Sequence, residues 1–255
     1  GCVVLLFLFL HRLFGGKNIT GAFIASLLFA LHPIHTEVVA NVKSSDEMLS
    51  FVLVFSALLV FIKYVQTGKT MQLLAGVFCF FLSLLAKETT ITFLAIIPVV
   101  FYLFINDNKQ RSKHIVLGIV ASTAAFLLLR YAVLSYYDAN SLPQISLIEN
   151  ALAMKGLSAE SRLATAILIM GQYLKLQFVP YPLICDYSYN YFPYTHFSDP
   201  VVLLSLLAYV ALAVVAVRLL LRDRRNLVAF GILFFLATIS LFSNIIIPIK
   251  ATMGE

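Results

Sequence analysis

Charge is scarce in this sequence. Only 12% of its 255 residues are Asp, Glu, Lys or Arg, whereas 61% are hydrophobic. Ordinary soluble domains carry roughly 25% charged residues, so this composition excludes that class and predicts an integral membrane protein. The net charge of +6 does not indicate nucleic-acid binding, because the basic residues lie singly at the ends of apolar runs and form no patch interleaved with aromatic side chains.

Cysteine is scarce too, which excludes two kinds of site. Cys2 and Cys79 fall inside apolar runs and only Cys185 lies in a polar loop, so neither a disulfide framework nor a CxxC metal site is available. The sequence also lacks an internal repeat and a signal-peptide cleavage pattern. Because it begins within an apolar segment and ends with "KATMGE", we expect residues 1–255 to be a single membrane domain, truncated at both ends, of a longer protein.

Long apolar runs dominate what is present. A membrane-crossing helix needs about 20 mainly apolar residues, fewer where an end is buried in protein. The candidate runs cover residues 2–14, 19–31, 48–65, 71–85, 91–105, 115–134, 201–221 and 227–249. We therefore expect an all-α fold, a polytopic bundle of about eight transmembrane helices with short interfacial helices on the outer face.

The basic residues assign the two sides of the membrane. Eleven of the eighteen Lys and Arg residues, but only two of the twelve carboxylates, fall in four alternating connections, at residues 12–17, 63–69, 107–113 and 218–225. Cytoplasmic loops carry the excess of Lys and Arg. We therefore expect these four connections to be inside and the other ten carboxylates to be outside.

One segment does not fit this alternation. Residues 162–180 could form a helix, but Gln172, Lys175 and Gln177 would be costly at the centre of a bilayer. We expect this segment to lie along the outer interface or to dip in and return. The region 135–200, with a tyrosine-rich stretch typical of the headgroup level, is then assigned to the outer face.

That topology brings four polar stretches to one surface, residues 32–47, 87–90, 185–197 and 250–255. We expect them to line one cavity at the boundary of lipid and water. In the first stretch, Pro33 suits the first turn of a helix, and His32 and His35 lie three residues apart. The pair could bind a metal, although no zincin signature follows; it could be hydrogen-bonded for structural reasons; or it could position a donor or acceptor.

Two pairs of charged residues have similarly open interpretations. Asp46 and Glu47 are either helix-end carboxylates favoured by the macrodipole, or groups that accept a proton or orient a hydroxyl. Lys87 and Glu88 are either an interfacial anchor, or they place an ammonium against the phosphate of an anionic lipid. Arg130 is a weaker candidate for that role, as is Lys250, and snorkelling would account for both of them equally well.

Four segments resemble motifs of one enzyme family. The string "LHPIHTEVVANVKSSDEMLSF", from residue 31, resembles the HP-hydrophobic-HTE-A-V-A motif and following acidic segment of transmembrane and tetratricopeptide-repeat O-mannosyltransferases and their bacterial relatives. "LLAKETTIT" is similar to their LAKE-x-x-IT turn, and "LICDYS" to their C-x-D-W-S loop, with Tyr187 in place of the usual tryptophan. "ATMGE" is similar to the start of their A-x-M-x-E-R segment, so the motifs follow family order to the end of the chain.

The resemblance implies a C-type glycosyltransferase, a multi-spanning enzyme that moves a sugar from a polyprenyl-phosphate carrier to an acceptor at the outer or lumenal face. The expected catalytic base of that family would lie upstream of Gly1, so the chain alone is expected to be inactive. The resemblance implies supporting roles for Glu37, Asp46 and Glu47. It implies substrate binding by His32, His35, Lys87, Glu88, Asp186 and Lys250.

The implied reaction is displacement at the anomeric carbon of a hexose, with mannose the expected sugar. A carboxylate deprotonates a protein hydroxyl while cations stabilise the departing lipid phosphate. The lack of a glycine-rich nucleotide loop favours a lipid-linked donor. No cofactor is expected, and a divalent metal has no support in the sequence. The expected partners are a polyprenyl-phosphate sugar, a protein or glycan acceptor and the bilayer, with no nucleic acid.

Two other functions remain as alternatives. A secondary transporter or lipid-sugar flippase should show inverted repeats and helices broken at the midplane, whereas the polar residues here gather at one face. A noncatalytic scaffold should tolerate substitution of Glu37 or Lys87. We expect a bacterial cytoplasmic membrane with the site facing the exterior, and the endoplasmic reticulum membrane is the alternative.

Overall fold

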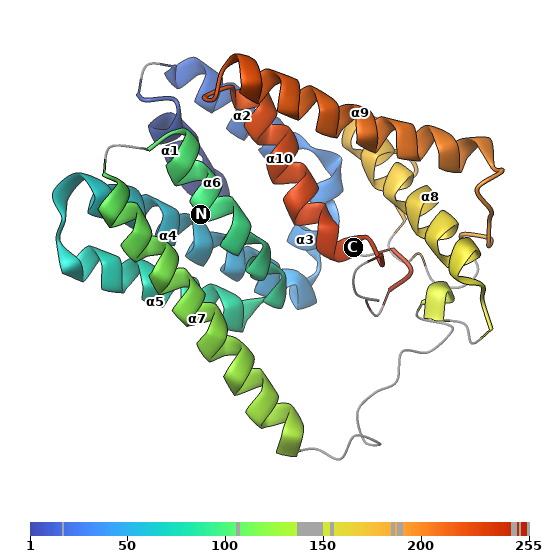
Figure 1. Cartoon of the computed structure of the whole chain (residues 1–255), viewed down its shortest axis with the longest axis horizontal. Coiled ribbons are helices and arrows are strands. Elements are labelled where there is room, and N and C mark those ends of the chain that lie inside the picture. The colour runs from blue at the N-terminus through green and yellow to red at the C-terminus, as the bar shows by residue number, and fades with distance from the viewer. Residues whose placement is uncertain are drawn as a thin grey trace. The chain divides into compact units, whose positions relative to one another are not determined.

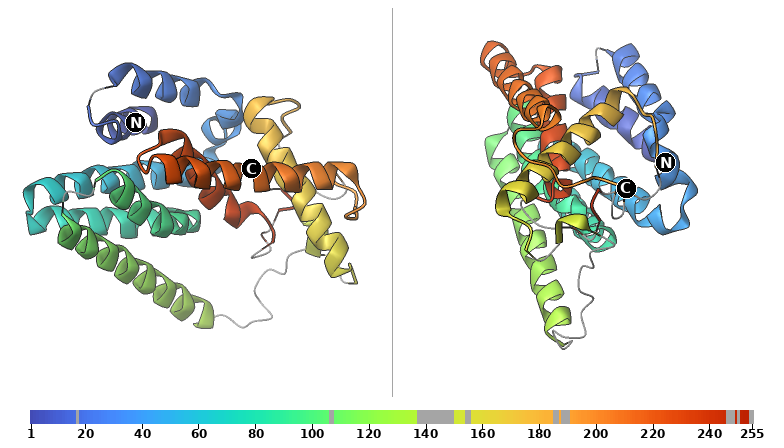
Figure 2. Two further views of the ribbon diagram at one scale, coloured as in Figure 1. Left: turned by 45° about the horizontal axis from the view of Figure 1, so that its top comes forward. Right: turned by 90° about the vertical axis from the view of Figure 1, so that its right-hand side faces the viewer.

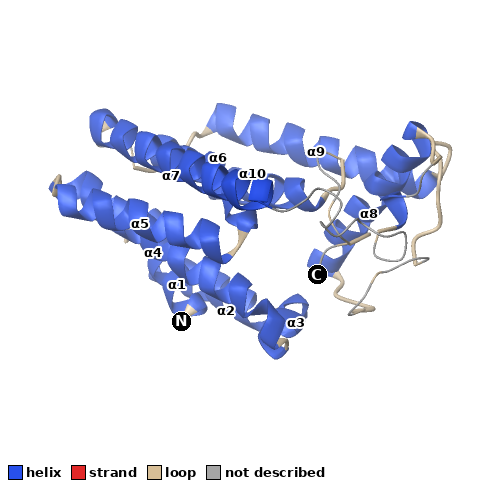
Figure 3. Ribbon diagram, turned by 90° about the horizontal axis from the view of Figure 1, so that it is seen from below, coloured by secondary structure: helices blue, strands red, loops and turns tan. Residues whose placement is uncertain are grey.

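The protein is helical throughout the part that its structure describes. The computed structural model describes residues 1–16, 18–105, 108–136, 150–153, 156–184, 187, 191–245, 249 and 251–253, and no strand occurs among them (Figure 3). Its residues form two compact units, Gly1–Ser141 and Leu142–Glu255. The predicted all-α class is confirmed. The expectation that residues 1–255 form one domain stays a prediction.

All eight apolar runs form helices. They are α1 (Cys2–Leu13), α2 (Ile19–Leu31), α4 (Ser45–Thr67), α5 (Thr70–Ala86), α6 (Phe93–Leu103), α7 (Lys109–Tyr136), α9 (Pro200–Arg222) and α10 (Leu227–Ile239). Within the described residues, three helical stretches are long and apolar enough to cross a membrane, Val42–Thr67, Lys109–Tyr136 and Pro200–Arg222, and the bent pair that begins with α2 could be a fourth. The remaining helices of the set are shorter and apolar, as expected of an integral membrane protein.

The last of these helices ends about ten residues earlier than the apolar run suggests. After α10 the chain forms a short 3-10 turn, η6 (Ser240–Phe242). Hydroxyl groups in this region donate to nearby carbonyls, Thr238 to Phe234 (2.9 Å) and Ser243 to Ser240 (2.7 Å). Asn244 then adopts a positive φ of 55°. Hydroxyls that bond the local backbone weaken a helix, and a left-handed residue at position 244 excludes its continuation through that point, even where the sequence is apolar.

In the first unit, α4 and α5 form an antiparallel hairpin and α7 packs beside α5 (Figure 1). The hairpin turns at Gly68, whose φ is 75°. Glycine also allows close packing along the helices, because a Cβ at Gly76 would clash with the ring of Phe61 and one at Gly118 would meet Val77. Small residues at such contacts are the usual means by which membrane helices approach closely.

The described carboxylates of the first unit all lie at one of its two ends, together with Lys43, Lys87 and Arg130, and the described charged residues of the other end are all basic. α1 runs parallel to α4, since Cys2 near its start contacts the carbonyl of Met48 and Phe9 farther along it contacts Phe55. α7 begins where α4 ends, since Arg111 Nη1 donates to the carbonyl of Val65 at 2.6 Å. The basic end therefore holds Arg12, Lys63, Lys69, Lys109, Arg111 and Lys113. The described carboxylates of the unit lie at the opposite end: Glu37, Asp46, Glu47 and Glu88. This separation agrees with the predicted topology, and the side of the membrane stays a prediction.

The second unit contains α8 (Ala159–Phe178), α9 and α10. Helix α8 crosses α9 (Figure 2), and the two approach closely because Gly171 leaves room for Ser205. The hydroxyl of Tyr209 on α9 donates to the carbonyl of Met170 on α8 at 2.9 Å. Despite its 20 residues, α8 is not apolar enough to count as a membrane span. Its expected place at the outer interface stays a prediction.

A buried network of hydrogen bonds in the second unit links Asn244 to Asn150 and to residues near the end of the chain. The carboxamide oxygen of Asn244 accepts from the Asn150 side chain (3.0 Å) and from the Ile249 N–H (2.9 Å), while its nitrogen donates to the carbonyls of Ala251 (3.2 Å) and Thr252 (3.0 Å). Asn150 and Thr252 are fully buried. Every hydrogen-bonding position of the Asn244 amide is thus used, which holds Ile249, Ala251 and Thr252 close to Asn244.

Candidate functional site

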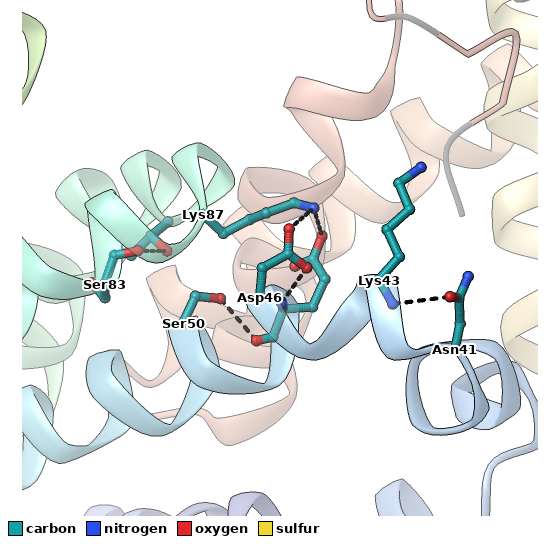
Figure 4. Close-up of polar contacts among 8 residues, drawn as sticks. Asn41, Lys43, Asp46, Ser50, Ser83 and Lys87 are labelled. Carbon is teal, nitrogen blue, oxygen red and sulfur yellow. Dashed lines mark hydrogen bonds and ion pairs between the residues drawn. The ribbon is translucent and has the colours of Figure 1, made fainter. Parts of the chain in front are cut away.

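A three-residue charge cluster joins α4 to the end of α5. Lys87 Nζ lies 2.8 Å from Asp46 Oδ2 and 3.1 Å from Glu47 Oε1 (Figure 4). The side chains are 30%, 39% and 34% exposed respectively, so the cluster is neither buried nor fully solvated. Residues 41 positions apart meet here because α4 and α5 run antiparallel, which places the start of one beside the end of the other.

The two carboxylates belong to the first turn of α4, where the positive end of the helix dipole favours negative charge. Asp46 uses its two oxygens differently. Oδ1 accepts from the N–H of Glu47 at 2.7 Å, and Oδ2 accepts from Lys87. The Ser50 hydroxyl donates to the Glu47 carbonyl at 2.8 Å, within the same turn. Asp46 is therefore held by its own helix independently of the lysine.

Lys87 sits on a well-fixed turn. α5 ends at Ala86, and Lys87 takes an extended conformation with φ −149° and ψ 124°. Its N–H donates to the Ser83 carbonyl at 3.0 Å, and its own carbonyl accepts from the N–H of Thr90 at 3.2 Å. The buried Thr90 hydroxyl donates to the Ser83 carbonyl as well, at 3.2 Å. The backbone beneath the ammonium is therefore anchored, and this explains the local role of Thr90 in "KETT".

The surroundings keep Lys87 charged. Partial burial alone would lower the pKa of Lys87, but the hydrogen bond from its ammonium to Asp46 and the nearby charge of Glu47 outweigh burial, so the pKa lies above its usual value. The next residue, Glu88, starts η3 (Glu88–Thr92) and forms an ion pair with Arg130 of α7. With three carboxylates and two cations, these five groups carry a net charge of −1.

The histidine pair lies at the same end of the unit. After α2, Pro33 begins the turn η1 (Pro33–His35), and the pair of helical segments bends by 53°. His32 Nδ1 accepts from the Ile34 N–H at 3.2 Å, which places the proton of the neutral ring on Nε2. The rings of His32 and His35 are 6.1 Å apart between centroids. The structure therefore supports a structural hydrogen bond for the Nδ1 atom of His32, one of the interpretations open from the sequence.

An aromatic series connects this pair with α4. His35 packs on Phe29 at 4.3 Å between centroids, Phe29 on Phe51 at 5.6 Å, and Phe51 on Phe55 at 4.2 Å. Phe51 is one helical turn beyond Glu47. Glu37 lies between the histidines and α4, on the five-residue helix α3 (Thr36–Ala40). The first two polar stretches of the sequence therefore share one end of the first unit.

Lys43 belongs to this region, although it was not among the predicted site residues. It lies in η2 (Val42–Ser44), where its backbone N–H donates to Asn41 Oδ1 at 3.0 Å. Its side chain is exposed and forms no ion pair with any described residue (Figure 4). The signal for it was present in the sequence, since it is the lysine of the charged stretch that follows the histidines.

Two predicted site residues, Asp186 and Lys250, lie outside the described residues. The stretches that contain them belong to the second unit, so the cavity expected from all four stretches stays a prediction. Tyr187, which follows Asp186, is buried and its ring packs against Phe192. Among the residues that are described, no three His, Cys, Asp or Glu side chains group closely enough to hold a metal ion.

Comparison with known proteins gives consistent matches. Residues 2–136 match the family model described as dolichyl-phosphate-mannose-protein mannosyltransferase. The chain is 42% identical over 103 residues to "Protein O-mannosyl-transferase Tmtc3" of Drosophila melanogaster, covering 38% of this chain and 11% of that protein. It is 35% identical over 104 residues to "Protein O-mannosyl-transferase TMTC1" of Homo sapiens, covering 37% and 12%.

A third relative, "Protein O-mannosyl-transferase F38B6.6" of Caenorhabditis elegans, is 39% identical over 79 residues, which are 31% of this chain and 10% of that protein. The matches thus span only about a tenth of each relative's length. No solved structure matches the chain. The family match covers more than half of the sequence and includes every member of the Lys87 cluster and the Glu88–Arg130 pair. The chain therefore belongs to the dolichyl-phosphate-mannose-protein mannosyltransferase family.

Proposed function

We propose that the chain forms part of a membrane enzyme that transfers mannose from a polyprenyl-phosphate carrier to a hydroxyl group of a protein, at the outer or lumenal face of the membrane. Family membership and the names of the relatives support the reaction class. The observation that carries the proposal is the cluster of Lys87 with Asp46 and Glu47 at the acidic end of the first unit. It puts a cation and carboxylates together beside apolar helices.

These groups suit the two charge changes of the reaction. When the sugar leaves its carrier, negative charge builds up on the lipid phosphate, and a nearby ammonium stabilises it. The attacking hydroxyl must lose its proton to a base, and Asp46, Glu47 or Glu37 can orient that hydroxyl and support the base. Lys87 is the cation assigned to the phosphate, and Arg130, held by Glu88, adds positive charge at the same end.

The remaining predicted residues keep supporting roles in the proposal. His32 and His35 lie at the bend between α2 and the helical segment that follows it, and would position the donor or the acceptor. Glu88 would hold Arg130 in place. Asp186 and Lys250 are proposed to contact substrate, in agreement with the motifs that contain them.

The test uses the complete protein that contains this chain, purified in detergent, with a radiolabelled polyprenyl-phosphate mannose and a protein acceptor. Transfer of the label is expected, and Lys87→Met should reduce it by at least about tenfold. Lys63→Met is the matched control, because Lys63 is an exposed lysine at the other end of α4, and it should retain full activity. Absence of transfer from any such donor contradicts the proposal; movement of the carrier across a bilayer without transfer would support a flippase instead.

A further inference from the structure

The ammonium of Lys87 is already engaged by two carboxylates. The ammonium has three N–H donors, and two of them face Asp46 at 2.8 Å and Glu47 at 3.1 Å. A phosphate can use only the remaining donor unless Lys87 gives up at least one carboxylate, so a phosphate that pairs with more than one N–H displaces a carboxylate. A phosphate and a carboxylate are alternative anionic partners for the same –NH₃⁺ group. An anion that binds Lys87 through more than one N–H therefore competes with residues of the protein itself.

The carboxylates are built to tolerate loss of the lysine. Asp46 keeps its hydrogen bond from the Glu47 N–H through Oδ1, the oxygen that does not contact Lys87. Both residues remain at the positive end of α4, and both are partly exposed to solvent. Ion pairs that are partly exposed are weak individually. Separation of this cluster thus leaves no fully buried, unpaired charge.

The lysine, for its part, is free to reorient. The turn that carries it is fixed by the bonds of Lys87 and Thr90 to Ser83, so the backbone need not move. The side chain has a flexible four-carbon stem and is partly exposed. The ammonium can therefore turn away from α4 while the "KETT" turn keeps its conformation.

We propose that Asp46 and Glu47 compete with the phosphate of the lipid-linked donor for Lys87, so that donor binding and release of the two carboxylates are coupled. This inference rests on the proposed function. Coupling is reciprocal: binding of the donor releases the carboxylates from Lys87, and the carboxylates lower the affinity of the site for the donor. Asp46 and Glu47 become available to an acceptor hydroxyl only when a donor occupies the site, which disfavours proton abstraction in its absence.

The test measures binding of a sugar-free C55 polyprenyl monophosphate to the complete protein in phosphatidylcholine nanodiscs. The double variant Asp46→Asn with Glu47→Gln should bind this lipid about threefold to tenfold more tightly than the unaltered protein, since two weak competing pairs are removed. Lys87→Met should bind it more weakly. In the Lys87→Met background, the two carboxylate substitutions should give no gain, because their effect acts through the lysine.

Unchanged or weaker binding by the carboxylate variant overturns the inference, and so does a gain that persists without Lys87. An equal gain with phosphatidic acid in place of the polyprenyl lipid would show that the site takes any lipid phosphate, which overturns the assignment to the donor. Thermal unfolding of each variant verifies that it is folded. Mannose transfer is measured separately, so a protein that shows the predicted binding but no transfer would refute the proposed function and leave the competition intact.

Discussion

Asp46 shows how a single residue is defined by two different contacts. Its place at the start of a helix is visible in the sequence, because a carboxylate pair precedes a long apolar run. Its contact with Lys87 is not, because that contact depends on how the α4–α5 hairpin aligns residues 41 positions apart. The sequence leaves open whether Asp46 is a helix-end carboxylate or a group that accepts a proton or orients a hydroxyl. The structure shows the helix-end position and adds the ion pair with Lys87, and the role toward a hydroxyl stays a prediction.

Removal of the lysine should cost stability. Lys87→Met leaves Asp46 and Glu47 adjacent without their cation, and we expect the free energy of unfolding to fall by about 1 kcal/mol, the upper range for partly exposed pairs. Thermal unfolding in detergent would measure this loss. An equal loss for Lys63→Met would show that general surface effects, and not the cluster, are responsible.

The contribution of the Lys87 ion pairs to the free energy of unfolding should depend on pH. Because the folded-state pKa of Lys87 is raised, its stabilising effect is complete below the unfolded pKa of a lysine, about 10.4, and is lost as pH rises through the folded value. The difference in unfolding temperature between the unaltered protein and Lys87→Met should therefore be constant from neutral pH to about 9 and shrink above about 10.5. A difference that shrinks in mildly acidic solution instead would contradict this assignment.

At the scale of helices, apolar runs specify where helices form but not always where they stop. The starts and ends of α2 and α5 follow the hydrophobic pattern within a residue or so. The end of α10 does not: the helix gives way to a 3-10 turn within an apolar stretch, where hydroxyl groups bond the local backbone and the left-handed Asn244 prevents the helix from resuming. Hydropathy does not reveal hydrogen bonds between side chains and the local backbone, and such bonds produce no periodic pattern in the sequence.

Two glycines, in the α4–α5 turn and inside α10, offer a matched pair of substitutions. Gly68 has a φ of 75°, and a Cβ there would also meet the guanidinium of Arg111, so Gly68→Ala should destabilise the protein by about 1 kcal/mol or more. A Cβ at Gly231, inside α10, would meet no described atom within 4 Å beyond its own helix, and Gly231→Ala should be neutral or stabilising by up to about 1 kcal/mol. Comparison of their unfolding temperatures tests both; equal effects would be unexpected.

The network around Asn244 should be sensitive to a change of one side chain. Asn244→Ala removes a buried amide that satisfies Asn150 and the Ile249 N–H, and it leaves alanine at a positive φ, so a loss of about 2 kcal/mol or more is expected. Asn244→Gly removes the strain of a side chain at positive φ, and it should recover about 1 kcal/mol of the lost free energy of unfolding. Unfolding midpoints of the two variants separate these contributions, and identical midpoints would show that the conformation at residue 244 is unstrained.

At the scale of the molecule, the separation of charge gives a topology that labelling can test. Lys43 and Lys113 are both exposed, at the acidic and basic ends of the first unit. In a variant without the three native cysteines, Lys43→Cys should react with a membrane-impermeant maleimide added outside, and Lys113→Cys only after the membrane is opened. Reaction of both positions from the same side would refute the predicted arrangement.

The close seam between α5 and α7 has one more consequence. A single added carbon at Gly118 would collide with Val77, and the Ser122 hydroxyl already reaches the Val77 carbonyl at 3.4 Å. A lipid chain cannot pass between two helices that pack this closely. A prenyl tail whose headgroup reaches Lys87 must therefore arrive along some other flank of the bundle, and widening this seam would loosen the scaffold rather than open a passage.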